Sequence, residues 1–238
     1  MFRRFKKSKL PSKDMTLPEQ LERMQRDWDQ RARENARYFV ATGQTDWTDQ
    51  EFFTSGEKAI AGEILTDTGN VYQGKDPAQM RVLEIGCGAG RLTRALSNIF
   101  GEVHAVDVSG EMIARARAAL QDRPNVSLYQ NNGCDLSVVP PLVFDFAYSS
   151  LVFQHIPSRE VIYTYVREVH RLLRPGALFK FQVQGYPAAD SPPDDTWHGV
   201  SFTREQATEM AQRCGFEHRH SYGEGDQYFW LWFFKPPA

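Results

Sequence analysis

The stretch that decides the fold is Arg81-Val82-Leu83-Glu84-Ile85-Gly86-Cys87-Gly88-Ala89-Gly90-Arg91-Leu92-Thr93. It joins an apolar run with β propensity, three glycines on alternate positions and a segment of helix-forming residues. A strand, a glycine turn and a helix in this order bring backbone close to a nucleotide-like ligand at the carboxyl edge of a parallel sheet. Glycine suits such a turn because a Cβ would block the approach or forbid the backbone angles.

The acid in this stretch, Glu84, narrows the kind of ligand. It stands two residues before Gly86, and the glycines follow the spacing Gly-x-Gly-x-Gly instead of the Gly-x-Gly-x-x-Gly of dinucleotide sites. A carboxylate at the mouth of the turn repels a pyrophosphate and attracts a cation. The stretch therefore favours a nucleoside-like ligand that carries positive charge.

These residues resemble motif I of the class I S-adenosylmethionine-dependent methyltransferases, E/D-x-G-x-G-x-G. The resemblance continues at residues 103–107, which read as a second strand ending in the acid Asp107. A carboxylate at that position can accept both ribose hydroxyl protons. The resemblance implies S-adenosylmethionine as cofactor, with S-adenosylhomocysteine as product.

A second informative stretch, residues 144–157, resembles the family's fourth strand and the turn after it. The resemblance implies that Tyr148 and Ser149 lie near the sulfonium. His155 is the one side chain here that titrates near neutrality, so it is a candidate general base, with structural and cofactor-side roles left open. After the third strand, Asn132 stands where the family usually has an aspartate that accepts from the adenine amino group.

The resemblance implies one cofactor-binding set: Glu84, Gly86, Cys87, Gly88, Gly90, Asp107, Val108, Met112, Asn132, Gly133, Tyr148 and Ser149. A long loop, 185–200, is rich in proline and aspartate, and loops of this length inside a compact domain usually serve function or move. Trp197 and His198 are the expected acceptor contacts in it.

The fold expected is α/β: a Rossmann-like, seven-stranded, mostly parallel sheet with an antiparallel last strand, helices on both faces and an N-terminal helical cap. Three parts are expected: a basic disordered tail (1–16), a helical extension (17–79) and the S-adenosylmethionine-binding methyltransferase domain (80–238). Periodicity and punctuation predict strands at 81–85, 102–106, 126–130, 145–149, 178–184, 216–222 and 227–235, helices from residue 17 and over 49–65, 90–99, 110–120, 159–173 and 203–214, and a polar loop at 69–79.

Composition excludes several classes of partner. The 238 residues carry a formal net charge of -2, which implies no global attraction to nucleic acid or to an anionic membrane. No apolar run reaches transmembrane length. The three cysteines are odd in number, widely separated and without metal-ligand spacing, which predicts a cytoplasmic protein with no metal site. The oligomeric state is not predicted.

The predicted reaction is methyl transfer from S-adenosylmethionine to a small-molecule acceptor by in-line SN2 displacement. The signatures of nucleic-acid amino methyltransferases and of cytosine C5 methyltransferases are absent from the sequence, and O-, N- and C-methylation stay open. Two alternatives are a nicotinamide-dependent Rossmann oxidoreductase, which Glu84 and the glycine spacing disfavour, and a non-catalytic binding protein with the methyltransferase fold.

Overall fold

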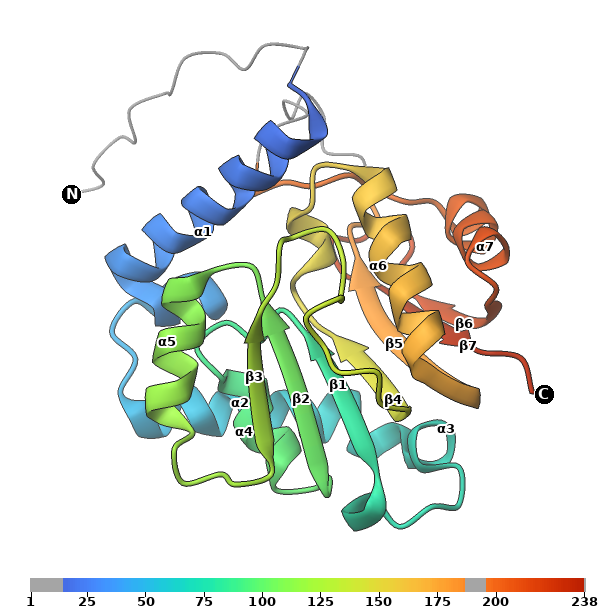
Figure 1. The fold of residues 1–238 in the computed structure, drawn as a ribbon, viewed down its shortest axis with the longest axis horizontal. Helices are drawn as coiled ribbons and strands as arrows, with labels where there is room; N and C mark the ends of the chain where they lie inside the picture. Colours follow the sequence, from blue (N-terminus) through green and yellow to red (C-terminus); the bar gives the residue numbers. More distant parts are fainter. Residues whose placement is uncertain (1–14, 187–195, 238) are drawn as a thin grey trace.

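A computed structural model of the chain describes residues 15–186 and 196–237. In it, a seven-stranded sheet has the order β3-β2-β1-β4-β5-β7-β6 (Figure 1). Among these strands, β7 alone runs antiparallel to its neighbours, as predicted. The strands are β1 Arg81–Ile85, β2 Glu102–Asp107, β3 Val126–Gln130, β4 Phe144–Ser149, β5 Leu173–Val183, β6 Glu217–Tyr222 and β7 Phe229–Phe234.

The strand order reverses at β1, which pairs with β2 on one side and with β4 on the other. In an open parallel sheet, ligands bind in the crevice that such a reversal leaves at the carboxyl ends of the strands. Every residue of β4 is buried, as expected of a strand that helices cover on both faces. The expected site edge is therefore the one where β1, β2 and β4 end.

Helices cover both faces of this sheet (Figure 1). The side chains of α2 and α4 pack with Val82, Val103 and Leu178 on one face, whereas α6 and α7 pack with Leu83 and Phe181 on the other. The α-helices are α1 Leu17–Val40, α2 Asp49–Glu63, α3 Thr68–Tyr72, α4 Arg91–Ser97, α5 Gly110–Ala119, α6 Arg159–Leu172 and α7 Arg204–Arg213, and short 3₁₀ turns lie at Leu65–Asp67, Pro77–Gln79 and Phe153–His155.

The two N-terminal helices begin as the sequence predicts. Thr48 and Glu51 form a capping box at the start of α2, in which each side chain bonds the other's backbone N–H. Helix α1 buries Met24, Ala32 and Ala36. It lies along the carboxyl-end side of the sheet (Figure 1), where it can complete a site.

Three boundaries differ from the sequence prediction. Residues 69–79 are not a loop, because α3 buries Val71 completely and a 3₁₀ turn follows. Helix α2 ends at Glu63, before Leu65. The strand predicted from residue 178 begins at Leu173. Its pairing with β4 shifts register between Leu173 and Leu178, which accommodates Pro175 and Gly176 within the strand.

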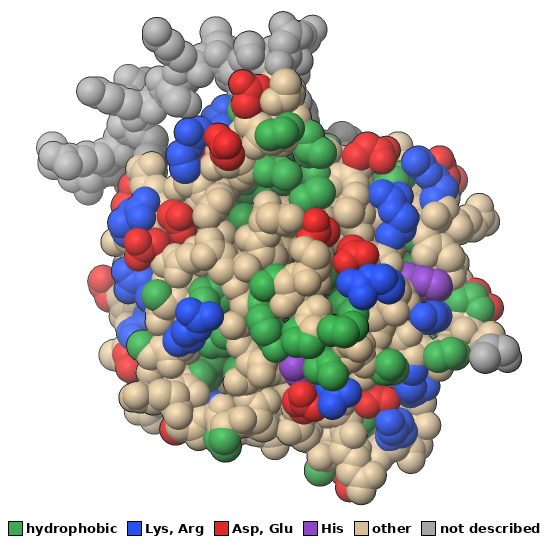
Figure 2. All heavy atoms as spheres, viewed as in Figure 1, with side chains coloured by type: hydrophobic (Ala, Val, Ile, Leu, Met, Phe, Trp, Pro, Cys, Tyr) green, Lys and Arg blue, Asp and Glu red, His purple; other side chains and the backbone are tan. Residues whose placement is uncertain are grey.

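The surface and the helices show two further features. Figure 2 shows basic and acidic side chains interspersed on one face, without a broad patch of one sign among the described residues. Within residues 15–186 and 196–237, none of the helices combines the length and the apolar character needed to cross a bilayer. The predicted basic tail, 1–16, lies outside the described residues except for its last two.

Candidate functional site

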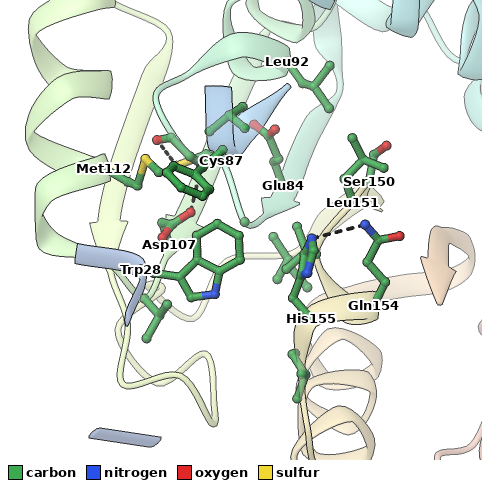
Figure 3. A pocket seen from close by; sticks show the side chains of 18 of the residues that line it. Trp28, Glu84, Cys87, Leu92, Asp107, Met112, Ser150, Leu151, Gln154 and His155 are labelled. Atoms are coloured by element: carbon green, nitrogen blue, oxygen red, sulfur yellow. Dashed lines mark hydrogen bonds between the residues drawn. The ribbon is translucent and has the colours of Figure 1, made fainter. Parts of the chain in front are cut away.

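A cavity opens at the carboxyl edge of the sheet, where β1 and β2 end (Figure 3). In Figure 3, Trp28 of α1 lies between two groups of lining residues. One group contains Asp107, Met112 and Cys87, and the other contains His155 and Gln154. The cavity therefore has a glycine-turn side and a side formed by the segment after β4.

The glycine turn adopts a conformation that only glycine reaches without strain. Gly86, Gly88 and Gly90 have φ values of 78°, 52° and 87°. The backbone N–H groups of Gly86 and Cys87 both donate to the carbonyl of Val106, at 2.8 and 3.0 Å, which holds the turn against β2. The turn thus presents bare backbone to the cavity.

Asp107 ends β2 and links the two loops that flank the cavity. One of its carboxylate oxygens accepts from the backbone N–H of Gly88 at 2.8 Å, and the other accepts from that of Ser109 at 2.9 Å. Burial raises the pKa of Asp107 to about 6, against the lowering effect of these hydrogen bonds. Each carboxylate oxygen keeps a second lone pair, so Asp107 can still accept from two ligand hydroxyls.

Glu84 is a buried acid on β1 that also lines the cavity. Its carboxylate accepts from the Thr93 hydroxyl at 2.6 Å. Burial raises the pKa of Glu84 to about 7, and the positive charge of Arg91 nearby partly offsets this. The carboxyl group is therefore ready to ionise when a cation enters the cavity.

Replacing Glu84 with Gln should change how stability depends on pH. The folded-state pKa of about 7 lies above the ordinary value, so the folded protein holds the proton that the unfolded chain releases. The contribution of Glu84 to the free energy of unfolding is thus complete below about pH 4.5 and declines as pH rises to about 7. From pH 5 to 8, the free energy of unfolding of wild type should fall by about 2.5 kcal/mol more than that of Glu84→Gln, as measured by urea unfolding. Parallel pH profiles would contradict the buried, raised-pKa carboxyl.

Most of the predicted site residues meet at this cavity. Those that line it are Glu84, Gly86, Cys87, Gly88, Asp107, Val108, Met112, His155, Trp197 and His198. Gly90 is not among the lining residues, because it caps α4 and a Cβ there would meet Leu120 at 2.9 Å. The sequence therefore locates both sides of the cavity.

Four predicted cofactor residues lie away from it. Tyr148 and Ser149 are fully buried: the Tyr148 hydroxyl donates to Glu63, and that of Ser149 donates to the Ile85 carbonyl at 2.9 Å. The exposed Asn132 accepts from two backbone N–H groups of its own turn. A Cβ on Gly133 would meet Met24 at 2.8 Å. The lining residues in these places are Asn131 and Ser150 to Val152.

The helical cap expected at the N-terminus reaches the cavity, but sequence reasoning did not name the residues of α1 that line it. Met24, Trp28, Phe39 and Val40 line the cavity, as does Thr42 just after the helix. Their helical spacing predicted a buried face on α1, without indicating which of its residues face the cavity. Arg37 of the same helix serves local structure, since it donates to the carbonyl of Trp47 at 2.7 Å.

His155 lies in the cavity wall with both ring nitrogens engaged. Nδ1 lies 2.6 Å from the Trp197 carbonyl oxygen, and Nε2 lies 3.1 Å from the Gln154 amide nitrogen. Its ring packs against those of Trp28 and Trp197, with centroids 5.2 and 5.0 Å away. The structure thus brings the candidate base and the candidate acceptor contact Trp197 together.

No group of three or more His, Cys, Asp or Glu side chains that could hold a metal ion occurs in the part of the chain that the structure describes. The chemistry of the cavity is that of the buried acid Glu84, the half-buried acid Asp107, bare backbone and aromatic rings. These groups suit an adenosine-like ligand that carries a cationic group.

Known proteins share this sequence pattern. Residues 83–181 match the Methyltransf_11 family, a methyltransferase domain. The chain is 32% identical over 111 residues to the ubiquinone biosynthesis O-methyltransferase of Xanthomonas campestris pv. campestris, which covers 46% of this chain and 45% of that protein. It is 32% identical over 144 residues to the malonyl-[acyl-carrier protein] O-methyltransferase of Enterobacter lignolyticus, covering 58% and 53%. The chain spans about half the length of these relatives.

Solved structures share the fold. The complex of DhpI with SAH superposes with a TM-score of 0.64 at 20% identity and covers 92% of this chain and 98% of its own. A SAM-dependent methyltransferase from Aquifex aeolicus has a TM-score of 0.56 at 17% identity, covering 80% and 100%. Residues 83–181 thus belong to a methyltransferase domain family, and the glycine turn, the sheet order and the solved structures give the chain the fold of the class I S-adenosylmethionine-dependent methyltransferases.

Proposed function

We propose that this protein transfers the methyl group of S-adenosylmethionine to a small-molecule acceptor. The observation that carries the proposal is a pair of acids, the buried Glu84 and the half-buried Asp107, on either side of a glycine turn at the point where the strand order reverses. Asp107 would accept from the two ribose hydroxyls, and Glu84 would face the cationic end of the cofactor. Cys87, Val108 and Met112 line the same side and would contact the adenosine.

Arg91 is suited to the amino-acid group of the cofactor. It lines the cavity with 7% of its surface exposed. Its Nη1 donates to Ser55 at 3.3 and 3.5 Å, and its buried Nε has no hydrogen-bond partner among the described residues. A buried guanidinium with an unused donor calls for an anion. Arg91 and Glu84 together therefore match a zwitterion, with a carboxylate toward Arg91 and an ammonium toward Glu84.

Arg91→Met should weaken S-adenosylhomocysteine about 30-fold, because it removes the charged partner of the ligand carboxylate. The matched ligand is 5′-methylthioadenosine, which has the same nucleoside and no amino-acid group. Arg91→Met should bind 5′-methylthioadenosine with an affinity within about twofold of wild type, and this binding also shows that the variant folds. Calorimetric titration measures both. An equal loss for the two ligands would place Arg91 away from the carboxylate.

The chain's own residues would serve the reaction by alignment. Methyl transfer from a sulfonium is an in-line displacement that quenches charge, so the enzyme must orient the acceptor and exclude water. The aromatic rings of Trp28, Phe39 and Trp197 line the cavity beside His155 and supply a dry wall. His198 lines the same side, so Trp197 and His198 are the proposed acceptor contacts.

The finer assignments are also proposals. The O-methyltransferase relatives support a hydroxyl or carboxyl acceptor. The free thiols of Cys87, Cys134 and Cys214 support a cytoplasmic setting. The interspersed surface charge and the net charge of -2 support a partner that is neither nucleic acid nor membrane. The division into an extension (17–79) and a methyltransferase domain (80–238) is supported by the family match within the second part.

The experiment that tests the activity is transfer of a labelled methyl group from S-adenosylmethionine to panels of phenols, carboxylates and amines. Labelled product from one panel supports the proposal and names the acceptor class. Cofactor binding with no transfer to any acceptor would favour the non-catalytic alternative. Turnover of a nicotinamide cofactor would favour the oxidoreductase.

A further inference from the structure

A continuous chain of hydrogen bonds runs beneath the side of the cavity that follows β4. The backbone N–H of Leu151 donates to Gln182 Oε1 at 3.0 Å, and Gln182 Nε2 donates to Gln154 Oε1 at 2.7 Å. Gln154 Nε2 then lies 3.1 Å from His155 Nε2 (Figure 3). His155 Nδ1 lies 2.6 Å from the Trp197 carbonyl oxygen. These hydrogen bonds join three segments that are distant in sequence: residues 151–155, Gln182 of β5 and Trp197.

The direction of this chain fixes the protonation of His155. A carbonyl oxygen can only accept, so Nδ1 carries the hydrogen that goes to Trp197. Gln154 Oε1 accepts from Gln182, so the Gln154 amide nitrogen faces Nε2 and donates to it. His155 is then a neutral imidazole with its hydrogen on Nδ1, and its Nε2 lone pair is already used.

The side chains that form these hydrogen bonds are buried, so the loss of any one of the bonds costs stability. Gln182 is fully buried, and Gln154 and His155 are 5% and 8% exposed. A buried amide that loses its partner stays desolvated without a hydrogen bond, which is unfavourable in free energy. The chain therefore favours one arrangement over others.

One end of the chain holds a strained turn on the cofactor side. Leu151 has a φ of 62°, one of two described non-glycine residues with positive φ, and it lines the cavity. Strain of this kind persists where the surroundings hold it, and it gathers at functional sites. The next residue, Val152, lies against the glycine turn, since a Cβ on Gly86 would lie 2.1 Å from Val152 Cγ2.

The other end holds the wall on the acceptor side. The Gly199 N–H donates to the Gln154 carbonyl at 2.6 Å, and that of Val200 donates to the Ile156 carbonyl at 3.1 Å. A Cβ on Gly199 would lie 2.5 Å from that Ile156 oxygen, so there is no space between the two segments. Trp197 is thereby fixed against His155 and against Phe39 of α1.

We infer that His155 is a positioning residue and not the general base of the reaction. As a neutral imidazole protonated on Nδ1, it ends a chain that couples the strained turn at Leu151 to the Trp197 segment. Because of this coupling, the conformation of the Leu151 turn, on the cofactor side, and that of the Trp197 segment, on the acceptor side, depend on each other. The role in positioning rests on the proposed methyl transfer, whereas the protonation state of His155 does not.

Nitrogen NMR of the full chain labelled with ¹⁵N-histidine tests the protonation state at pH 7.5. The His155 signals, assigned by their loss in His155→Gln, should show a protonated Nδ1 and an unprotonated Nε2. Gln182→Leu should shift both signals although Gln182 does not touch His155. The matched control is Gln184→Leu, just past the end of β5 and outside the hydrogen-bond chain, which should leave the His155 signals unchanged. A hydrogen on Nε2 in wild type, or no shift in Gln182→Leu, would overturn the inference.

The coupling to the cofactor side has its own measurement. Gln182→Leu should weaken S-adenosylhomocysteine about tenfold, because the Leu151 turn loses the acceptor of its N–H. Circular dichroism and thermal unfolding establish that the variant is folded. Shifted His155 signals with unchanged affinity in this variant would overturn the coupling. If wild type itself bound no S-adenosylhomocysteine, the proposed function would fail, and the NMR result would still stand or fall by itself.

Discussion

Asp107→Ala should reduce the affinity for S-adenosylhomocysteine at least about 100-fold. The carboxylate is placed to accept from two ribose hydroxyls, and a hydrogen bond to a charged group contributes about 1.5–3 kcal/mol, so the loss of two costs about 3 kcal/mol or more. The variant also frees the backbone N–H groups of Gly88 and Ser109, which adds to the effect through the shape of the turn. Calorimetric titration gives the change directly.

The control for this variant is Asp122→Ala. Asp122 pairs with Arg94 at 3.2 Å and is half-exposed on the surface, where such pairs contribute little. The Asp122→Ala variant should bind S-adenosylhomocysteine with the same affinity as wild type. An Asp107→Ala variant that bound as tightly as wild type would remove the ribose assignment.

Gly86→Ala should destabilise the fold by about 3 kcal/mol and abolish cofactor binding. The φ of Gly86 is 78°, where an L side chain costs about 1–2 kcal/mol, and its Cβ would lie 2.1 Å from Val152 Cγ2, a clash that costs about as much again. Urea unfolding and titration with S-adenosylhomocysteine measure the two losses.

Val152→Ala in the same chain separates these two causes. It removes the methyl groups that the new Cβ meets, so the double variant should regain about half of the lost stability while the backbone strain remains. Gly69→Ala is the control, because nothing lies within 4 Å of a Cβ there and its φ is ordinary. Full recovery in the double variant would show that strain at Gly86 is absent, and no loss in Gly86→Ala would contradict the described turn.

The sequence predicts the sheet and the glycine-turn side of the site because local signals determine them. The alternation of strands and helices, the glycines and the acids at the ends of β1 and β2 are all readable within short windows. The family resemblance added the antiparallel β7, which the structure confirms.

The remaining parts depend on long-range packing. Which residue after β4 faces the cavity depends on the reversal at Leu151, whose positive φ no residue type announces. Ser150, Leu151 and Val152 therefore replace the predicted Tyr148 and Ser149 in the wall. The family resemblance led to the expectation of a helical cap, but which residues of α1 line the cavity could not be predicted, because any apolar surface would satisfy the periodicity of its apolar face.

The hydrogen-bond chain through Gln182 and His155 could not be predicted from the sequence either, because it also depends on long-range packing. Glutamine in a central strand reads as an interruption of the apolar pattern, and its partners lie 28 and 31 residues away along the chain. A lone histidine after β4 fits a base, a structural role or a ligand contact equally well. Only the direction of its hydrogen bonds separates these roles.

The most direct test of the central claim is calorimetric titration of the whole protein with S-adenosylmethionine, S-adenosylhomocysteine and NAD in parallel. The two acids around the glycine turn, Glu84 and Asp107, predict micromolar binding of the first two ligands and none of the third. Binding of NAD alone would contradict the assignment of Glu84 and Asp107, and with it the proposed methyl transfer.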